Sequence, residues 1–270
     1  MTRIVTTASA IVGAVSRSHI AGLDLITDIG DTEHDVNCAA GEARDVLNAV
    51  TMALATETTK QIDDAWAVGD DAGGLDTGSV AADTLYAIWL IHRSDTGVVD
   101  ILISASFADP TMPTDYDAKR LIGAVCTDSS ANLIDFNQSG DYFRYTSEVI
   151  QDINDASITS NTFEVAALSV PPSAIAHFYV LATNATSTDD TSTIRIRTAG
   201  SSDVASGRLG VASLWEGDAS TTEDLLHVGF IMECLVNTAS QIAYNAQETS
   251  GTLRVRVFVL GFTMLTRRDP

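Results

Sequence analysis

The sequence predicts an all-β fold, a jelly-roll-like β-sandwich whose two halves either interleave or form two domains. Short runs of apolar and β-branched residues recur along the chain, separated by turns rich in Gly, Asp, Ser and Asn. Regularly spaced strands of this kind are typical of sandwiches. Aromatic residues make up only 6% of the chain, while Ala, Thr, Ser and Val are abundant, a composition that suits closely packed strands. No repeat period typical of a propeller or solenoid occurs.

In the first part of the chain, the clearest strand signals lie between residues 84 and 145. Residues 85–92 and 98–104 are apolar runs joined by a turn that ends at Gly97, where a positive φ is favourable. A second pair of strands is expected at 121–127 and 133–137, followed by an edge strand at 142–145. Upstream, residues 41–55 fit either a helix or strands joined by a turn. A short helix is favoured for residues 58–66, because Thr58 and Thr59 suit a helix start.

The second part of the chain follows a polar connection at residues 146–160. Seven more strands are expected there, at residues 162–170, 174–183, 193–198, 208–214, 226–236, 241–245 and 253–260. The strands at 227–236 and 253–262 are expected to be partners across a core. In the last strand Arg254 and Arg256 alternate with apolar residues, which predicts a basic stripe on its outer face. The predicted organisation is an N-terminal arm (1–20), a β-rich module (21–145), the connection (146–160) and a second sandwich half (161–270).

Charge excludes some classes of function. The chain carries 36 Asp and Glu against 15 Lys and Arg, a net charge of −21. Nucleic-acid affinity depends on Lys and Arg contacts to phosphates, so we expect no nucleic-acid partner. No segment approaches the ~20 apolar residues that a membrane span requires, and the N-terminus lacks the compact apolar core of a signal peptide. We therefore expect that the protein does not insert into a membrane. We also expect that it is synthesised in the cytoplasm.

The residue types that carry chemistry do not form a recognisable catalytic or cofactor motif. Cys38, Cys126 and Cys234 are far apart and are expected to be free, mostly buried thiols. The five histidines lack metal-ligand spacing. Residues 70–76 combine Asp and Gly, but their spacing differs from a calcium loop, which favours turn residues over a calcium site. We expect no enzymatic activity, no cofactor and no metal.

One ligand-binding position is suggested by an aromatic residue beside acidic ones. Trp215 precedes Glu216 and Asp218 in a predicted turn after a strand. Sugars stack on exposed aromatic rings beside polar groups, whereas most tryptophans are packed in the interior. The interpretations are a carbohydrate site formed by Trp215, Glu216 and Asp218, or a structural tryptophan.

An ordered set of motifs between Lys60 and Phe143 resembles a domain of tailed-bacteriophage virion proteins of the tail-fibre, appendage or head-spike type. The motifs are Asp64-Ala-Trp66, Gly69, Gly73 to Gly78, Ile91 to Gly97, Lys119-Arg120, Ile122-Gly123 and Thr127-Asp128-Ser129. Members of this family often have a second basic residue where Leu121 stands here. The resemblance implies a β-rich module on a virion surface and no catalytic residue.

The resemblance and the composition together lead to one expected function with two alternatives. We expect a structural subunit of a tailed-phage virion, a tail fibre, spike or similar appendage, which mediates attachment or connection on the particle. Its partners would be other copies of itself in a homotrimer, other virion proteins, and host surface polysaccharide. The alternatives are a carbohydrate-binding receptor-recognition module and a capsid decoration protein attached through the arm at residues 1–20.

Overall fold

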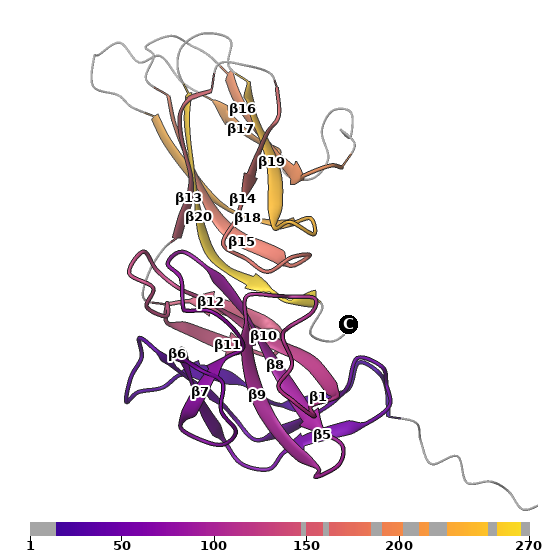
Figure 1. The fold of residues 1–270 in the computed structure, drawn as a ribbon. Helices are drawn as coiled ribbons and strands as arrows, with labels where there is room; N and C mark the ends of the chain where they lie inside the picture. The colour runs from indigo at the N-terminus through magenta and orange to yellow at the C-terminus, as the bar shows by residue number, and fades with distance from the viewer. Residues whose placement is uncertain are drawn as a thin grey trace, which may run out of the picture.

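The computed structural model describes residues 15–146, 150–158, 162–184, 191–201, 211–215, 226–247 and 253–265. Within these ranges the regular elements are all β-strands, which confirms the all-β prediction. No helix there is long and apolar enough to cross a membrane. Figure 1 shows two β-rich halves stacked end to end, with the first half in indigo to magenta and the second in orange to yellow.

The first half contains two sheets and a hairpin, formed by its last two strands, that belongs to a sheet of the second half. Its strands are β1 (Ile20–Gly22), β2 (Leu25–Thr27), β3 (Asp35–Cys38), β4 (Gly41–Arg44), β5 (Thr51–Leu54), β6 (Thr58–Ala65), β7 (Ala72–Leu75), β8 (Leu85–Arg93), β9 (Val98–Ser104), β10 (Ala118–Cys126), β11 (Phe136–Ser139) and β12 (Tyr142–Tyr145). Seven strands form one sheet in the order β10-β8-β9-β7-β6-β3-β2, and β1-β4-β5 form another. The hairpin predicted around Gly97 is confirmed: β8 pairs with β9, and Gly97 has a φ of 75°.

The second half has the strand pairing of a jelly roll. Its strands are β13 (Ile150–Ile158), β14 (Glu164–Ala167), β15 (Ile175–Asn184), β16 (Thr191–Thr198), β17 (Val211–Trp215), β18 (Leu226–Leu235), β19 (Gln241–Gln247) and β20 (Leu253–Thr263). The pairs are nested: β13 with β20, β14 with β19, β15 with β18, and β16 with β17. Pairing of β15 with β20 and of β16 with β19 completes two four-stranded layers. This arrangement confirms the predicted sandwich.

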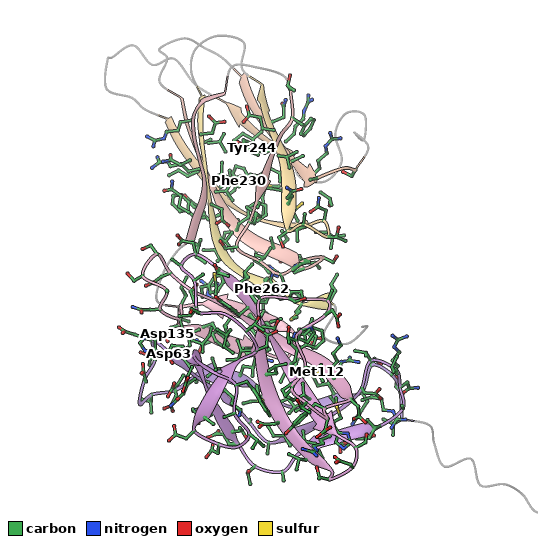
Figure 2. All side chains as sticks on the ribbon, viewed as in Figure 1. Asp63, Met112, Asp135, Phe230, Tyr244 and Phe262 are labelled. Carbon is green, nitrogen blue, oxygen red and sulfur yellow. The ribbon has the colours of Figure 1, made fainter. Side chains whose placement is uncertain are left out.

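Strand β20 joins the two halves. One of its sides pairs with β15, whereas the other pairs first with β13 and then with β12 of the first half. The rings of Phe143 and Phe262 stack with centroids 4.9 Å apart, and both side chains are buried. Figure 2 shows Phe262 at the boundary between the halves. Because β12 lies between β11 and β20, the prediction that residues 142–145 form an edge strand was wrong.

The predicted helix at 58–66 was also wrong, because these residues form β6. Thr58, Lys60 and Ile62 are buried, while the residues between them are more exposed. This period of two is that of a strand, and Thr58, Thr59 and Ile62 are β-branched residues that favour strands. Residues 41–55, which fitted either structure, form the hairpin of β4 and β5.

Two expectations about strand pairing and one about the connection between the halves differ from the structure. The strands at 121–127 and 133–137 meet only at one bridge, between Thr127 and Leu133, because β10 pairs with β8 and β11 pairs with β12. Strands β18 and β20 are not partners across a core, since both flank β15 in one sheet. Most of the described part of the connection at 146–160 is strand β13.

The interior follows the alternation of each strand. In the second half Phe178, Val180, Val255, Val257 and Val259 are fully buried, while residues between them face outward. Arg254 is exposed and Arg256 half-buried, consistent with the predicted stripe. All three cysteines are free, as expected; two are buried and Cys234 is half-buried.

Candidate functional site

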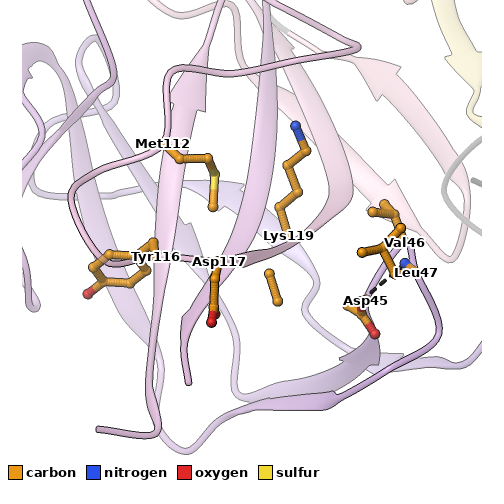
Figure 3. Close-up of a pocket in the computed structure, with 8 residues that line it drawn as sticks. Asp45, Val46, Leu47, Met112, Tyr116, Asp117 and Lys119 are labelled. Carbon is orange, nitrogen blue, oxygen red and sulfur yellow. Dashed lines mark hydrogen bonds between the residues drawn. The ribbon is translucent and has the colours of Figure 1, made fainter. Parts of the chain in front are cut away.

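Two neighbouring cavities beside strand β10 form the candidate site, which is called the groove below. The larger has a volume of about 280 Å³ and is lined by Asp45, Val46, Leu47, Met112, Tyr116, Asp117, Ala118 and Lys119. The second, of about 230 Å³, is lined by Val46, Trp89, Phe107, Ala108, Leu121, Pro172 and Ser173. Val46 lines both cavities. Figure 3 shows Lys119 between Met112, Tyr116 and Asp117 on one side and Val46 and Leu47 on the other.

Lys119 is the only cation that lines the groove. Strand β10 places it beside Trp89 of β8, and its ammonium lies 5.4 Å from the centre of the Trp89 ring. The same ammonium donates a hydrogen bond of 2.6 Å to the carboxylate of Asp109. This bond lowers the pKa of the Asp109 carboxyl. Because Asp109 is exposed, the pair is open to solvent and to competing polar ligands.

The loop between β4 and β5 is held in place by the buried carboxylate of Asp45. Its oxygens accept hydrogen bonds from the backbone N–H groups of Leu47, Ala49 and Val50, at 3.1, 2.6 and 2.7 Å. In addition, the N–H of Val46 donates to the carbonyl of Lys119 in β10. These bonds fix Val46 as a wall of both cavities and leave the Leu47 side chain exposed.

The second cavity lies where the two halves meet. Pro172 and Ser173 come from the loop between β14 and β15, whereas Trp89 and Leu121 come from the first half. Trp89, in the apolar run that the sequence predicts as a strand, is buried, and its indole N–H donates to the carbonyl of Ser106 at 3.1 Å. The ring therefore forms the floor of the cavity. The groove offers apolar surface, one ammonium and flanking carboxylates, a combination found in ligand-binding sites.

The residues predicted to bind carbohydrate are only partly described. Trp215 is the last residue of β17, and its backbone pairs with Thr191. Glu216 and Asp218 lie outside the described residues. The groove along β10 is a different surface, and sequence reasoning did not single out its lining residues, apart from Lys119 in the family motif.

Acidic side chains gather on another part of the first half, where Figure 2 labels Asp63 and Asp135. Burial raises the pKa of Asp35 to about 6, helped by the negative charges of Asp31, Asp28 and Asp63. The predicted turn at 70–76 begins with turn residues: Asp71 has a φ of 53°, and Asp70 accepts a hydrogen bond from the N–H of Thr59. Strand β7 then begins at Ala72. In the described ranges no group of three or more His, Cys, Asp or Glu side chains is placed to hold a metal ion.

The histidines have separate environments. His19 contacts Glu42 at 2.8 Å, His34 contacts Asp31 at 3.1 Å, and His177 contacts Glu233 at 3.0 Å. His92 is buried in β8, and its Nδ1 has no hydrogen-bond partner.

Part of the segment that carries the family resemblance is buried in the first half, whereas other motif residues, such as Asp64 and Asp95, are exposed. The Lys60 ammonium lies 3.1 Å from the carboxylate of Asp100 and 2.6 Å from the carbonyl of Ala67, and it faces the Trp66 ring at 5.5 Å. Desolvation lowers the pKa of Lys60. Arg120 is fully buried and donates to the carbonyls of Arg17 and Arg44.

Arg120 also bears on the predicted arm at residues 1–20. The carbonyl of Arg17 accepts its hydrogen bond, and Ile20 is a buried residue of β1. Residues 17–20 therefore belong to the folded first half. The remainder of the predicted arm, up to residue 14, lies outside the described residues.

The described fold is that of an all-β protein whose second half has jelly-roll topology. No family model and no curated protein matches this chain. Similar solved structures include a Bacillus thuringiensis Cry1Da tryptic core variant, with 10% identity, 93% of this chain and 53% of that chain covered, and a TM-score of 0.25. Another is the infectious bursal disease virus VP2 subviral particle, with 10% identity, 93% and 72% covered, and a TM-score of 0.21. The chain thus spans about half the length of the Cry1Da core, and similarities this low carry no argument about its function.

Proposed function

We propose that this chain is a structural subunit of a tailed-phage virion, part of a tail fibre, spike or similar appendage that mediates attachment or connection on the particle surface. The observation that carries the proposal is the nested strand pairing of the second half, β13 with β20 through β16 with β17. Jelly rolls with this topology are a common architecture of viral capsid domains and of lectins. Fold alone does not define function, so the first half supplies a second argument.

The second argument comes from the positions of the motif residues. Lys60, Trp66 and Arg120 lie in the segment that resembles phage virion proteins; Lys60 and Arg120 are fully buried, and Trp66 is half-buried against the core. Gly73 lies so close to β6 that a Cβ would meet the carbonyl oxygen of Ala65 at 2.0 Å. The buried residues of this segment stabilise the fold, which supports a structural role. In this proposal the partners are other copies of the chain, assembled as a homotrimer, and other virion proteins.

The test is to locate the chain in particles. Antibodies raised against the purified chain are applied to virions from the phage whose genome encodes it, and bound antibody is imaged by immunogold electron microscopy. Labelling of a tail or a surface appendage supports the proposal. Particles that carry no label, and whose protein content determined by mass spectrometry lacks this chain, would falsify it.

A carbohydrate-binding receptor module is a second candidate, favoured by the use of jelly rolls in lectins. The candidate site is formed by Trp215, Glu216 and Asp218. Host surface polysaccharide would shift the tryptophan fluorescence of the wild-type chain, and Trp215→Ala would abolish this shift. Trp66→Phe is the control, because Trp66 is half-buried in the first half and its indole N–H is bonded to Ile101. An equal shift in the Trp215→Ala variant excludes this site.

A capsid decoration protein remains the third candidate. Since Arg17 and Ile20 belong to the fold, the arm to remove is residues 1–14 rather than 1–20. If the chain is a capsid decoration protein, the chain without residues 1–14 should fold, with an unchanged circular dichroism spectrum, but should not bind capsids. Binding equal to that of the full chain excludes attachment through this arm.

A further inference from the structure

The outer face of the sheet β13-β20-β15-β18 carries a row of apolar side chains. Registers place Tyr179 of β15 directly beside Ile231 of β18 on one side and Phe258 of β20 on the other. Ile231 is 71% exposed, and Leu235, further along β18, is 46% exposed. The alternate residues of these strands, such as Phe178 and Val257, are buried in the sandwich. The sheet therefore has an apolar inner face, and an apolar row on its outer face that the described residues leave exposed at Ile231 and Leu235.

The packing of this face makes it flat. The rings of Tyr179 and Phe258 lie 6.2 Å apart at an angle of 38°. The Tyr179 ring extends over Gly229 of β18, where a Cβ would meet the Tyr179 hydroxyl at 1.6 Å. A glycine at this position lets the aromatic ring lie along the sheet instead of projecting from it. The result is a level surface formed by Ile231, Tyr179 and Phe258.

Charged groups flank this surface with opposite signs. Glu233 of β18 lies on one side with its side chain 65% exposed, and contacts His177. On the other side, Arg254 and Arg256 of β20 point to the same outer face, and Arg254 also donates to Asn154 of β13. The chain as a whole has a net charge of −21, so two copies repel each other over most of their surfaces. Here, however, the Glu233 side of one copy is complementary to the arginine side of another.

We propose that this outer face, formed by Ile231, Tyr179, Phe258, Glu233 and the two arginines, binds a second copy of the chain. The inference rests on the proposed role as a virion subunit and names the surface through which subunits associate. Burial of the apolar row provides the affinity, and pairing of Glu233 with an arginine of the neighbouring copy fixes the orientation. Among the described strands, β18 is the last of its sheet, and this edge lies beside the same contact.

The experiment compares two aspartate substitutions at exposed apolar positions of the two opposed sheets. Ile231→Asp places a charge in the apolar row, and Val165→Asp is the matched control, because Val165 is 56% exposed on β14 of the other sheet. Solution mass is measured by light scattering over a range of concentrations. We expect wild-type chain and Val165→Asp to self-associate alike, and Ile231→Asp to raise the dissociation constant at least tenfold.

Ile231→Thr is a second variant that separates loss of the contact from a folding defect. Thr keeps the β-branched side chain that strands favour and removes only apolar surface. It is expected to weaken self-association less than Asp, with unchanged circular dichroism. A monomeric wild-type chain overturns the inference, as does an Ile231→Asp variant with wild-type mass or a Val165→Asp variant weakened equally. These outcomes are independent of immunogold labelling, so the inference can fail while the proposed virion location stands.

Discussion

The ammonium of Lys60 lies 3.1 Å from the carboxylate of Asp100, and the two side chains are 0% and 3% exposed. Asp100 also accepts a hydrogen bond from the N–H of Gly69 at 2.9 Å. The pair thus ties β6, the turn after it and β9 together at the centre of the first half. The chain has only one other lysine, Lys119, whose partner Asp109 is exposed.

The two lysines allow a direct comparison of a buried and an open ion pair. Lys60→Met leaves the Asp100 charge buried without its partner, and removing one member of such a pair costs about 3–5 kcal/mol. Lys119→Met breaks an open pair, which is worth about 0–1 kcal/mol. Urea unfolding followed by circular dichroism measures both free energies. Similar losses for the two variants would contradict the structural role assigned to Lys60.

Asp35 predicts an unusual dependence of stability on pH. Its pKa is about 6 in the folded chain, against a usual value of 3.8. Between these values the folded state binds a proton that the unfolded state does not, so this group's contribution to stability rises as pH falls from about 7 to 4. Above pH 6 the ionised carboxylate is destabilising. Asp35→Asn is therefore expected to stabilise the chain by about 1–2 kcal/mol at pH 8. It should also reduce the increase in stability that the wild-type chain shows when the pH is lowered.

Thermal unfolding at pH 8 and pH 5 checks this prediction. The control is Glu57→Gln, which removes one negative charge from an exposed turn. If Glu57→Gln stabilises the chain as much as Asp35→Asn does, the effect comes from the net charge and not from burial of Asp35.

Replacing Gly73 by alanine, which adds a single methyl group, is predicted to lower the stability of the chain considerably. A Cβ there would meet the carbonyl oxygen of Ala65 at 2.0 Å, and backbone atoms cannot move aside without separating β6 from β7. Gly73→Ala should destabilise the chain by about 1–3 kcal/mol or more. At Gly30 the added Cβ meets only the end of the Asp28 side chain, so Gly30→Ala is the control and should be near neutral. Midpoints of urea unfolding distinguish the two.

The stacked pair of Phe143 and Phe262 predicts that the halves unfold together. Because β20 pairs with strands of both halves, we expect tryptophan fluorescence and circular dichroism to report one coincident transition. Phe262→Ala should cost about 3–5 kcal/mol and separate the two signals. Phe107→Ala, a half-buried position in a loop of the first half, should cost less and leave the transitions coincident. Two transitions in the wild-type chain would show that the halves are independent domains.

Local sequence patterns were enough to predict most strands but not all of their partners. Alternation along residues 253–260 predicted both the strand and the inward face of Val255 and Val257, because side chains of a strand alternate strictly. The same alternation was present in residues 58–66. A helix was predicted there because Thr58 and Thr59 suit a helix start, and the inward position of Lys60 is explained only by Asp100, which lies beside it in the fold.

The sequence by itself determined the all-β class, the net negative charge and the turn at Gly97. These features depend on residues close together in the chain or on total charge. Only the tertiary structure decided that β20 crosses from one half to the other, that Val46 and Lys119 border a groove, and that Tyr179 lies between Ile231 and Phe258. Each of these contacts joins strands distant in sequence, and their pairing is selected by the packing of the whole fold, which no local pattern encodes.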